Sequence, residues 1–336
     1  MSFPALRRTL AAAAAGVVAV TLTACTDSRD DEPAGDGGSS AEAPETRTIA
    51  TKFGDVEVTG EPTKVVALGW GDAETALALG VQPIGASDWL AFGEDVDGVG
   101  PWAQDLYDQS PTFFGTLELD TQAVGALEPD LILDVRGSGD EDRHEALEKI
   151  GVPVISVPDG GDNYLTTTEQ QVTMIAAALG KEDLGKELLA GVDDAFSTAA
   201  EEHPEYAGKT STVSAYSSDG WGVYTSGDAR VQFLENLGFT QKPEVEAAAT
   251  DNFFIPVSNE ELELLDADVA VSFPIFVEAS EITDQPLYNA LPVVEEGRSV
   301  LIEDPVLANA FSIATTLGIE YAIDNVVPLL AEAAAA

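Results

Sequence analysis

One arrangement of segments occurs twice in this chain of 336 residues: a helical stretch, an acidic break and a short apolar run. The first copy is "AVGALEPDLILDVRG" at 123–137, and the second is "ELELLDADVAVSFP" at 261–274. In each half a further helix, turn and apolar run follow, "ALEKIGVPVISVPD" and "ALPVVEEGRSVLIED". Short apolar runs between helices are typical of strands that are covered on both faces of a parallel sheet. The repeat therefore predicts an α/β protein with two similar Rossmann-like lobes and mainly parallel sheets.

Each half begins with its own strand and helix. In the first half, "KVVALGWGDAETALALG" predicts a buried strand that ends near Gly69. A helix follows, with Asp72 as its N-cap and Gly80 as its stop. The looser counterpart at 209–239 predicts a strand, an aromatic loop and a helix that ends at Gly238. The sequence therefore predicts two equivalent strand ends, one in each lobe.

The stretch "KEDLGKELLAGVDDAFSTAAEEHPEYAG" separates the two halves. Five apolar residues recur in it at helical spacing, namely Leu184, Leu188, Leu189, Val192 and Phe196. A helix of roughly 20 residues spans roughly 30 Å. We therefore expect one rigid helix at 181–204 to join two lobes. The first lobe covers 47–180 and starts with a β-hairpin, and the second covers 205–336. Because ligands bind beyond the carboxyl ends of the strands in open α/β sheets, the binding site is expected in the cleft between the lobes.

The N-terminus predicts a targeting segment. Arg7 and Arg8 precede an apolar run at 11–22, and "LTAC" ends at the single cysteine, Cys25. These features predict a signal peptide at 1–24. "LTAC" resembles a bacterial lipobox, in which diacylglycerol alkylates the cysteine; a plain signal peptide with an incidental cysteine is the alternative. Residues 25–46 are rich in Gly, Ser, Pro and Asp, and we expect a disordered tether that holds the protein on the extracytoplasmic face of the cell membrane.

The charge balance excludes some partners. The chain has 15 Lys and Arg residues against 60 Asp and Glu residues, a formal net charge of −45. A surface of this sign repels nucleic acids and anionic lipid headgroups, so no nucleic-acid partner is expected. The acidic surface is explained either by solubility alone or by adaptation to high salt.

Aromatic residues concentrate in the predicted loops at the strand ends. Those that we expect to line the cleft are Trp70, Trp102 and Tyr164 in the first lobe and Tyr216, Trp221, Tyr224, Phe254 and Phe276 in the second. Trp89, the remaining tryptophan, falls in such a loop too. The alternative is that an aromatic residue fills the core of its lobe, which we expect for Phe113, Phe233 and Phe273. Rigid aromatic side chains beside Gly, Pro or Ser suit a large and partly apolar ligand.

Two arginines stand near these loops. Arg136 directly follows a predicted buried strand and precedes Gly137. It is placed either to donate a fork of hydrogen bonds to acidic oxygens of a ligand or to form a salt bridge with a nearby carboxylate. Arg230 is expected to start a helix that faces the same cleft.

The sequence contains no recognisable catalytic constellation. "GWGDAE" resembles a dinucleotide fingerprint, but Glu74 replaces the last glycine and its charge would lie near the pyrophosphate. "RGSGD" lacks the spacing of a nucleophile elbow. His144 and His203 are the only histidines, and neither has a partner at metal-ligand spacing. We therefore predict a protein that is not an enzyme, with no cofactor and no metal site of its own.

The segments taken together resemble a known family. The lipobox, the tether, "KVVALGWGDAETALALGVQPIGASD", "ALEPDLILDVR", the linking helix and "VSNEELELLDADVAV" are similar to the substrate-binding proteins of ABC importers for ferric siderophores, haem and cobalamin. The resemblance covers about residues 47–330. It implies the class III periplasmic-binding-protein fold, with limited hinge motion. It also implies a monomer that binds a ferric siderophore in the cleft, with the iron held by the chelator, and delivers it to a membrane permease.

The resemblance also implies where the permease docks. Family members use one carboxylate from each lobe, and the matching motif in the second lobe places this carboxylate at Glu260. The alternative role for Glu260 is a helix N-terminal acid that interacts with the helix dipole. In the first lobe the matching position holds Gln122, so this chain departs from the pattern there, with Glu118 or Asp120 as nearby substitutes.

Other functions remain open at this stage. Cobalamin or haem is the alternative ligand within the same family, although haem usually needs a His or Tyr ligand and neither histidine is placed for it. A surface hydrolase on a related fold is the third alternative. Because the chain is so acidic, a neutral or cationic hydroxamate complex is electrostatically easier to bind than a tri-anionic catecholate.

Overall fold

The computed structural model describes residues 45–87, 92–93, 96–116, 119–161, 164–249 and 252–336, all within one compact unit, Pro44–Ala336. The signal peptide, Cys25 and almost all of the expected tether lie outside the described residues, as do Trp89 and Glu118. No described helix is both long enough and apolar enough to cross a bilayer.

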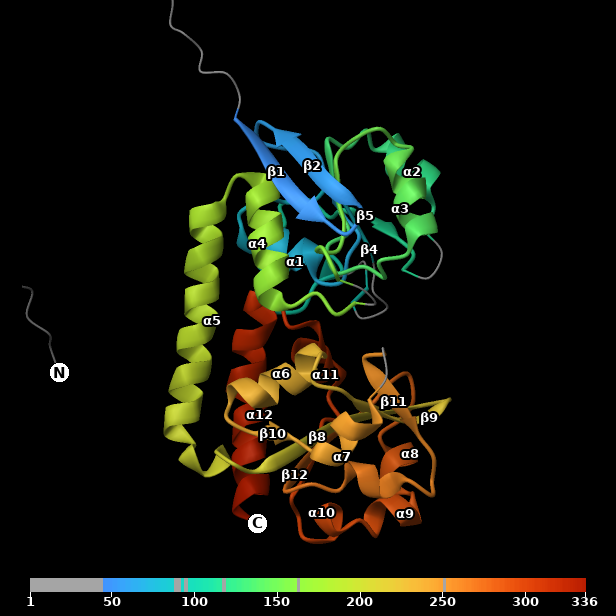
Figure 1. Ribbon diagram of the computed structural model, residues 1–336, viewed down its shortest axis with the longest axis vertical. Coiled ribbons are helices and arrows are strands. Elements are labelled where there is room, and N and C mark those ends of the chain that lie inside the picture. Colours follow the sequence, from blue (N-terminus) through green and yellow to red (C-terminus); the bar gives the residue numbers. More distant parts are fainter. Residues whose placement is uncertain (1–44, 88–91, 94–95, 117–118, 162–163, 250–251) are drawn as a thin grey trace, which may run out of the picture. The chain divides into compact units, whose positions relative to one another are not determined.

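The sheet of the first lobe is entirely parallel, with the strand order β5-β4-β3-β6-β7. Its strands are β3 (Val65–Ala67), β4 (Gly85–Ser87), β5 (Thr112–Phe114), β6 (Leu131–Leu133) and β7 (Val154–Ile155). Helices cover both faces: α1 (Asp72–Ala78) and α4 (Thr168–Leu179) on one, α2 (Thr121–Ala126) and α3 (Glu141–Glu148) on the other (Figure 1). The predicted hairpin is present as β1 (Thr46–Thr51) and β2 (Gly54–Thr59).

The central strand shows why the apolar runs are continuous. Val65 and Ala67 pack toward α1 and α4, whereas Val66 and Leu68 pack toward α2 and α3. Side chains alternate between the two faces of a strand, and both faces of this sheet are covered, so every position along it must be apolar. The prediction of a doubly covered parallel sheet is therefore confirmed in the first lobe.

The sheet of the second lobe is mixed. Its order is β11-β9-β8-β12-β13, with β10 beside β8. These strands are β8 (Thr210–Ser217), β9 (Gly220–Tyr224), β10 (Thr240–Gln241), β11 (Phe254–Val257), β12 (Val269–Pro274) and β13 (Ser299–Leu301). The strands β8, β10, β12 and β13 pair in parallel, as predicted, but β9 runs antiparallel to both of its neighbours.

The expectation of an aromatic loop after the first strand of the second lobe was wrong. Gly220 has a φ of 102° and turns the chain directly back along β8 as the hairpin strand β9. Trp221 and Val223 then belong to one buried cluster, whereas Tyr224 belongs to another on the opposite face. Alternation of this kind indicates a strand, and Asp219-Gly220 is a turn signal that precedes it.

Helices surround the mixed sheet. They are α6 (Ala229–Asn236), α7 (Pro243–Ala248), α8 (Ser280–Thr283), α9 (Pro286–Asn289), α10 (Pro292–Glu295), α11 (Pro305–Ile313) and α12 (Thr316–Ala335). The helix expected at the start of the second repeat copy is only a 3₁₀ helix, Leu262–Leu265. Its two end residues are both buried, and the i,i+3 spacing of a 3₁₀ helix places them on the same face.

Two long helices lie side by side. One is the predicted linking helix, observed as α5 (Glu182–Glu202). The other is α12, which packs into the core of the second lobe and also contacts α1 of the first lobe (Figure 1). The helix α12 was not predicted from the sequence. The two-lobed fold with one long linking helix is confirmed, whereas the exact lobe boundaries at 180 and 205 stay a prediction.

The start of α1 differs from the prediction in one residue. Gly71, with a φ of 78°, occupies the N-cap, and Asp72 is the first residue of the helix. The buried carboxylate of Asp72 instead accepts hydrogen bonds from Val135 N at 2.7 Å and from Gln171 Nε2 at 2.6 Å. It thus ties the end of the neighbouring strand to α4, a role that no local pattern encodes. Gly80, with a φ of 77°, follows the helix as expected.

Candidate ligand-binding cleft

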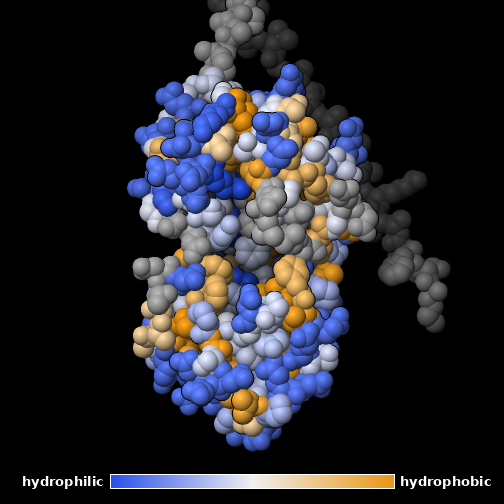
Figure 2. Space-filling model, turned by 90° about the vertical axis from the view of Figure 1, so that its right-hand side faces the viewer, coloured by the Kyte–Doolittle hydropathy of each residue, from blue (hydrophilic) through white to orange (hydrophobic). Residues whose placement is uncertain are grey.

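Two adjoining cavities lie where the strand ends of the two lobes meet. The first has a volume of about 530 Å³ and the second about 800 Å³. Trp70, Arg230 and Ile275 line both, so we treat the two cavities together as the cleft. Figure 2 shows one face of the described part of the chain. Hydrophobic side chains gather there along the border of the second lobe that faces the first.

The turn between β3 and α1 presents Trp70 to the cleft. The backbone of Trp70 is fixed: its N–H donates to Arg136 O at 3.0 Å, and its carbonyl accepts from Gln171 Nε2 at 2.8 Å. A Cβ atom at Gly69 would lie 2.3 Å from the Asp72 carboxylate and 2.8 Å from Arg136 N, so only glycine fits there. Gly69 therefore lets the strand end pass close to its neighbours, and the indole of Trp70 lines the cleft.

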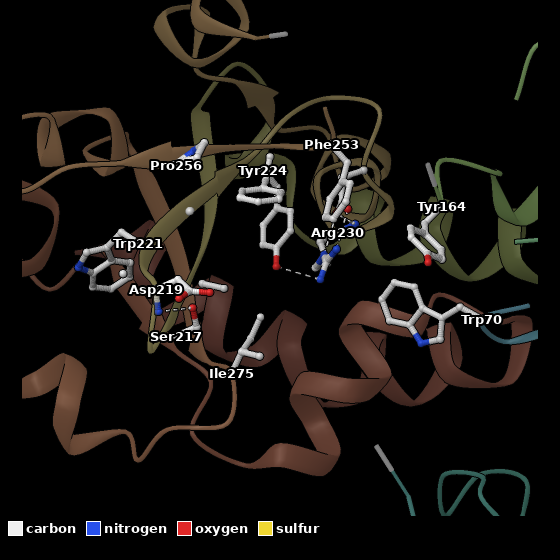
Figure 3. A pocket seen from close by; sticks show the side chains of 15 residues that line it. Trp70, Tyr164, Ser217, Asp219, Trp221, Tyr224, Arg230, Phe253, Pro256 and Ile275 are labelled. Atoms are coloured by element: carbon white, nitrogen blue, oxygen red, sulfur yellow. Dashed lines mark hydrogen bonds and ion pairs between the residues drawn. The ribbon is translucent and has the colours of Figure 1, made fainter. Parts of the chain in front are cut away.

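Aromatic residues from both lobes face each other across the first cavity. Trp70 and Tyr164 come from the first lobe, and Tyr224 and Phe253 come from the second (Figure 3). Tyr164 has a φ of 64°, an uncommon conformation for a side chain of its size. Strained residues of this kind cluster at ligand sites, where the surrounding fold holds them in place. The wall of the cavity is thus largely apolar and assembled from two lobes.

Arg230 lies in this wall as half of a buried ion pair. It is near the start of α6, and its Nε and Nη2 donate to the two carboxylate oxygens of Asp228 at 2.7 Å each. Its Nη1 donates to the Tyr224 hydroxyl at 3.1 Å, and the guanidinium lies 3.7 Å from the Tyr224 ring centroid. Burial acts to lower the pKa of Arg230, but the Asp228 charge more than offsets it, so the pKa lies above its usual value. The pair stays charged and compensated.

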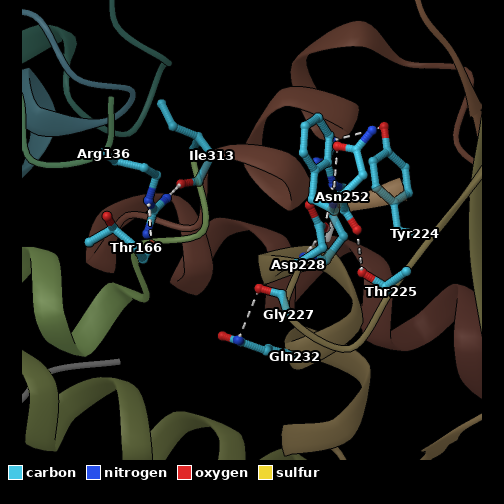
Figure 4. A network of polar contacts seen from close by, with 11 residues as sticks. Arg136, Thr166, Tyr224, Thr225, Gly227, Asp228, Gln232, Asn252 and Ile313 are labelled. Atoms are coloured by element: carbon cyan, nitrogen blue, oxygen red, sulfur yellow. Dashed lines mark hydrogen bonds and ion pairs between the residues drawn. The ribbon is translucent and has the colours of Figure 1, made fainter. Parts of the chain in front are cut away.

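The structure does not bring Arg136 to the cleft wall. The side chain is 1% exposed, and its Nε and Nη1 donate to the carbonyl oxygens of Thr166 at 2.9 Å and Ile313 at 2.5 Å. Figure 4 shows this guanidinium apart from Asp228 and Tyr224. Burial lowers the pKa of Arg136 to about 10. Arg136 lines neither cavity and forms no close ion pair among the described residues; it connects backbone of the first lobe to the C-terminal end of α11.

Trp102 also lies outside the lining of both cavities. Its Nε1 donates to Glu74 Oε2 at 2.8 Å, and its ring packs 5.0 Å from that of Tyr321 on α12. Glu74 in turn accepts from the Thr315 hydroxyl at 2.6 Å, so this group joins α1 to α12 across the lobes. Burial raises the pKa of Glu74 above its ordinary value. The side chain of Trp102 thus contributes to the contact between the lobes.

The predicted residues of the second lobe divide between core and cleft. Tyr216 lines neither cavity and packs 5.1 Å from Trp221. Trp221 reaches the first cavity but is only 4% exposed, stacks on Tyr288 and donates from Nε1 to Gln285 Oε1 at 3.0 Å. Tyr224, Phe254 and Arg230 line the first cavity, and Phe276 lines the second.

Several lining residues were missed from the sequence. They are Asp219, Asp228, Pro256 and Ile275 in the first cavity and Glu278, Glu281 and Glu303 in the second. Ile275 directly follows β12, and Glu278 and Glu303 lie in the segments after β12 and β13, so the rule that ligands bind at strand ends would have found them. Asp219 lies in the turn of the hairpin β8–β9, and Asp228 lies in the segment after β9, which was predicted to be a loop.

The cleft offers no imidazole. Among the residues that line the two cavities there is neither His144 nor His203. His144 is buried, stacks 4.0 Å from Phe53 and lies 2.7 Å from Ser156 Oγ through Nδ1. Within the described ranges, no group of three or more His, Cys, Asp or Glu side chains is placed to hold a metal ion.

The predicted docking residues lie on the surface. Glu260 is exposed in the turn before the 3₁₀ helix Leu262–Leu265, and Gln122 is exposed on α2. The Asp120 carboxylate caps α2 by accepting from the backbone N–H groups of Gln122 at 2.9 Å and Ala123 at 3.1 Å. The docking role of both residues stays a prediction.

Comparisons with known proteins show which proteins this chain is similar to. Residues 65–305 match the sequence model of the family described as periplasmic binding protein. The Fe(3+)-citrate-binding protein YfmC of Bacillus subtilis (strain 168) is 28% identical over 291 residues, which cover 82% of this chain and 83% of that protein. The probable siderophore-binding lipoprotein YfiY of the same organism is 25% identical over 325 residues, covering 91% of this chain and 93% of that protein.

A solved structure matches the fold. The structure of PiaA from Streptococcus pneumoniae TIGR4, in complex with ferrichrome, superposes with a TM-score of 0.73 at 25% identity. The superposition covers 86% of this chain and 98% of that one. Both the order of elements and their arrangement in two lobes are therefore those of a known class of binding protein.

Proposed function

The chain belongs to the periplasmic binding protein family, and we propose that it captures a ferric siderophore in the cleft and delivers it to the permease of an ABC importer. The observation that carries this proposal is the apolar, aromatic wall that the two lobes build together, with Trp70 and Tyr164 opposite Tyr224 and Phe253. The relatives named above support it, because one is a ferric citrate-binding protein and another a probable siderophore-binding lipoprotein.

The size and chemistry of the cleft suit such a ligand. Small-molecule sites have volumes of roughly 300–1,000 Å³ and are mostly apolar with a few polar groups. Both cavities fall in this range, at about 530 and about 800 Å³. Flat aromatic side chains bury the organic shell of a chelator at little cost in conformational entropy. The iron stays with the chelator, so the protein needs no metal ligands of its own.

We infer the cellular location from the N-terminal sequence. We propose that Cys25 carries a diacylglycerol group and anchors the protein on the extracytoplasmic face of the cell membrane, where a monomer reaches its permease on the tether at 25–46. The name of one relative as a lipoprotein supports this location. Glu260 and the surface around Gln122 are the proposed docking points for the permease. We expect no catalytic activity, because the family and the relatives are binding proteins.

Ligand binding to the purified protein tests the proposal. Ferric trihydroxamates, ferric citrate, a ferric catecholate, haemin and cobalamin are titrated separately, and tryptophan fluorescence and heat of binding are both recorded. At least one ferric siderophore should bind saturably and more tightly than its iron-free chelator. Binding of haemin or cobalamin alone would contradict the proposal and select the alternative ligand of the family.

A further inference from the structure

The charged side chains that line the cleft are almost all acidic. Five carboxylates line the two cavities, namely Asp219 and Asp228 in the first and Glu278, Glu281 and Glu303 in the second. Arg230 is the one Lys or Arg residue among the described lining residues. The sign of the electrostatic potential in the cleft therefore depends on whether Arg230 is available to a ligand.

Arg230 is already compensated inside the protein. Both oxygens of Asp228 accept from it at 2.7 Å, and its remaining terminal nitrogen donates to Tyr224. The ion pair is buried, with side chains that are 6% and 7% exposed. An anionic ligand would have to compete with this bidentate pair, and separating a buried pair is strongly unfavourable. Arg230 thus contributes shape and a flat polar face to the cleft, but little net positive potential.

The other four carboxylates are exposed and have no cation beside them. Within the part of the chain that the structure describes, no Lys, Arg or His nitrogen lies within 4.0 Å of Asp219, Glu278, Glu281 or Glu303. Their charge therefore acts on whatever enters the cleft. At the short range of a bound ligand, salt screens this field less than it screens charges farther apart.

An exposed aromatic ring stands beside these acids. Phe276 is 80% exposed, has a φ of 54° and lines the second cavity two residues before Glu278. The backbone strain and the solvent-exposed ring are both unfavourable for the free protein, so this position is one where a ligand contact is expected. A ring face close to carboxylates attracts an alkylammonium group through cation–π and charge interactions together.

From these observations we propose that the cleft selects ferric siderophores of zero or positive overall charge. The chelated core occupies the aromatic first cavity, and an ammonium arm, where the ligand has one, lies in the second cavity near Phe276, Glu278 and Glu303. The inference rests on the proposed function and adds the chemical class: a neutral or cationic trihydroxamate. The same carboxylates repel anionic ferric citrate and ferric catecholate complexes.

A matched pair of ligands tests this class. Ferric desferrioxamine B is a linear trihydroxamate complex with a terminal ammonium, and its N-acetyl derivative is the same complex without that charge. Dissociation constants are measured at low salt for this pair, for ferrichrome, for ferric citrate and for a ferric tris-catecholate. The cationic complex should bind about fivefold tighter than its acetylated form, and both anionic complexes should bind most weakly.

Protein variants assign the effect to the cleft. The double variant Glu278→Gln, Glu303→Gln should lose the preference for the cationic complex and keep the affinity for the acetylated one. The control, Glu187→Gln with Glu201→Gln, changes the net charge equally at exposed positions of α5 and should leave both affinities unchanged. Melting temperatures confirm that each variant is folded.

The outcomes separate the two proposals. Tighter binding of an anionic ferric complex than of every neutral and cationic one overturns the charge class but leaves siderophore capture intact. Equal binding of the desferrioxamine pair, or equal losses in the cleft variant and its control, overturns the placement of an ammonium arm beside Phe276, Glu278 and Glu303. If no ferric complex of any charge binds, the proposed function itself fails.

Discussion

Single residues in this chain have roles that depend on which way one side chain points. Trp70 and Trp102 both lie in first-lobe loops, yet one faces the cleft and the other hydrogen-bonds Glu74 between the lobes. Trp70 is flanked by Gly69 and Gly71, whereas Trp102 is flanked by Pro101 and Ala103. The distinction is physical, because the indole N–H of Trp102 satisfies a buried carboxylate whereas the ring of Trp70 lines an open cavity.

Replacement of Trp70 should affect binding more than stability. Trp70→Ala removes a half-buried ring whose backbone partners remain, so we expect about a tenfold loss of ferric siderophore affinity and a small change in melting temperature. Calorimetric titration and thermal denaturation measure the two effects. A large loss of stability with unchanged affinity would place Trp70 in the core.

Replacement of Trp102 should show the opposite balance. Trp102→Phe keeps an aromatic ring but removes the five-membered ring with the N–H that donates to buried Glu74. Leaving a buried acceptor with one partner fewer costs about 1–3 kcal/mol of the free energy of unfolding. Urea denaturation gives this value, and Trp70→Phe is the matched control, expected to change it little. Equal stability of the two variants would show that the bond contributes nothing.

At the scale of elements, the join between α11 and α12 carries the contact between lobes. Ile313 O accepts from Arg136, Ala314 O accepts from the Thr168 hydroxyl at 2.7 Å, and the Thr315 hydroxyl donates to Glu74. Ala314 has a φ of 49°, so the chain enters α12 through a left-handed residue that is not glycine. The linking helix α5 is thus supplemented by a second, polar connection between the lobes.

Relief of that strain is testable. Ala314→Gly removes the Cβ from a left-handed position and should raise the free energy of unfolding by up to about 1 kcal/mol, offset in part by the greater freedom of glycine in the unfolded chain. Ala331→Gly, in the regular part of α12, should lower it by about 1 kcal/mol. Chemical denaturation compares the two, and a loss at both positions would mean that Ala314 is not strained.

At the scale of the whole molecule, buried acids at the meeting point of the lobes link stability to pH. Burial raises the pKa of Asp72 to about 6, and it raises that of Glu74 as well. The folded state therefore holds protons that the unfolded state releases near pH 4. The contribution of Asp72 is complete at acidic pH and is lost as the pH rises through about 6, and that of Glu74 has the same sign.

The protein should accordingly be more stable at pH 5 than at pH 7.5. The part due to Asp72 over this range is about 1.4 kcal/mol, because the interval from pH 5 to its pKa of about 6 is one unit, which corresponds to about 1.4 kcal/mol. Thermal denaturation across this range measures the slope, which should be smaller in Asp72→Asn. The control Asp194→Asn removes an exposed carboxylate and should leave the slope unchanged. Equal slopes in both variants would show that Asp72 has an ordinary pKa.

Local sequence patterns predicted much of the fold. The apolar runs at Val65–Ala67 and Leu131–Leu133 predicted strands covered on both faces, because every residue along such a strand must be apolar. The helical spacing of apolar residues predicted α5, and the alternation of the first segment predicted the β1–β2 hairpin. Strand-end loops also placed Trp70, Tyr164, Phe254 and Phe276 where the cleft now lies.

Tertiary structure decided the rest. Whether Arg136 reaches a ligand or the carbonyl of Ile313 depends on contacts between residues far apart in sequence, and the same holds for Trp102 and Glu74. The acidic wall of the second cavity combines Glu278 after one strand with Glu303 after the next, which only the pairing of β12 and β13 brings together. Sequence by itself determined the first-lobe strands and the linking helix, because their periodicity is local. The lining and the charge of the cleft followed from packing, which is not local.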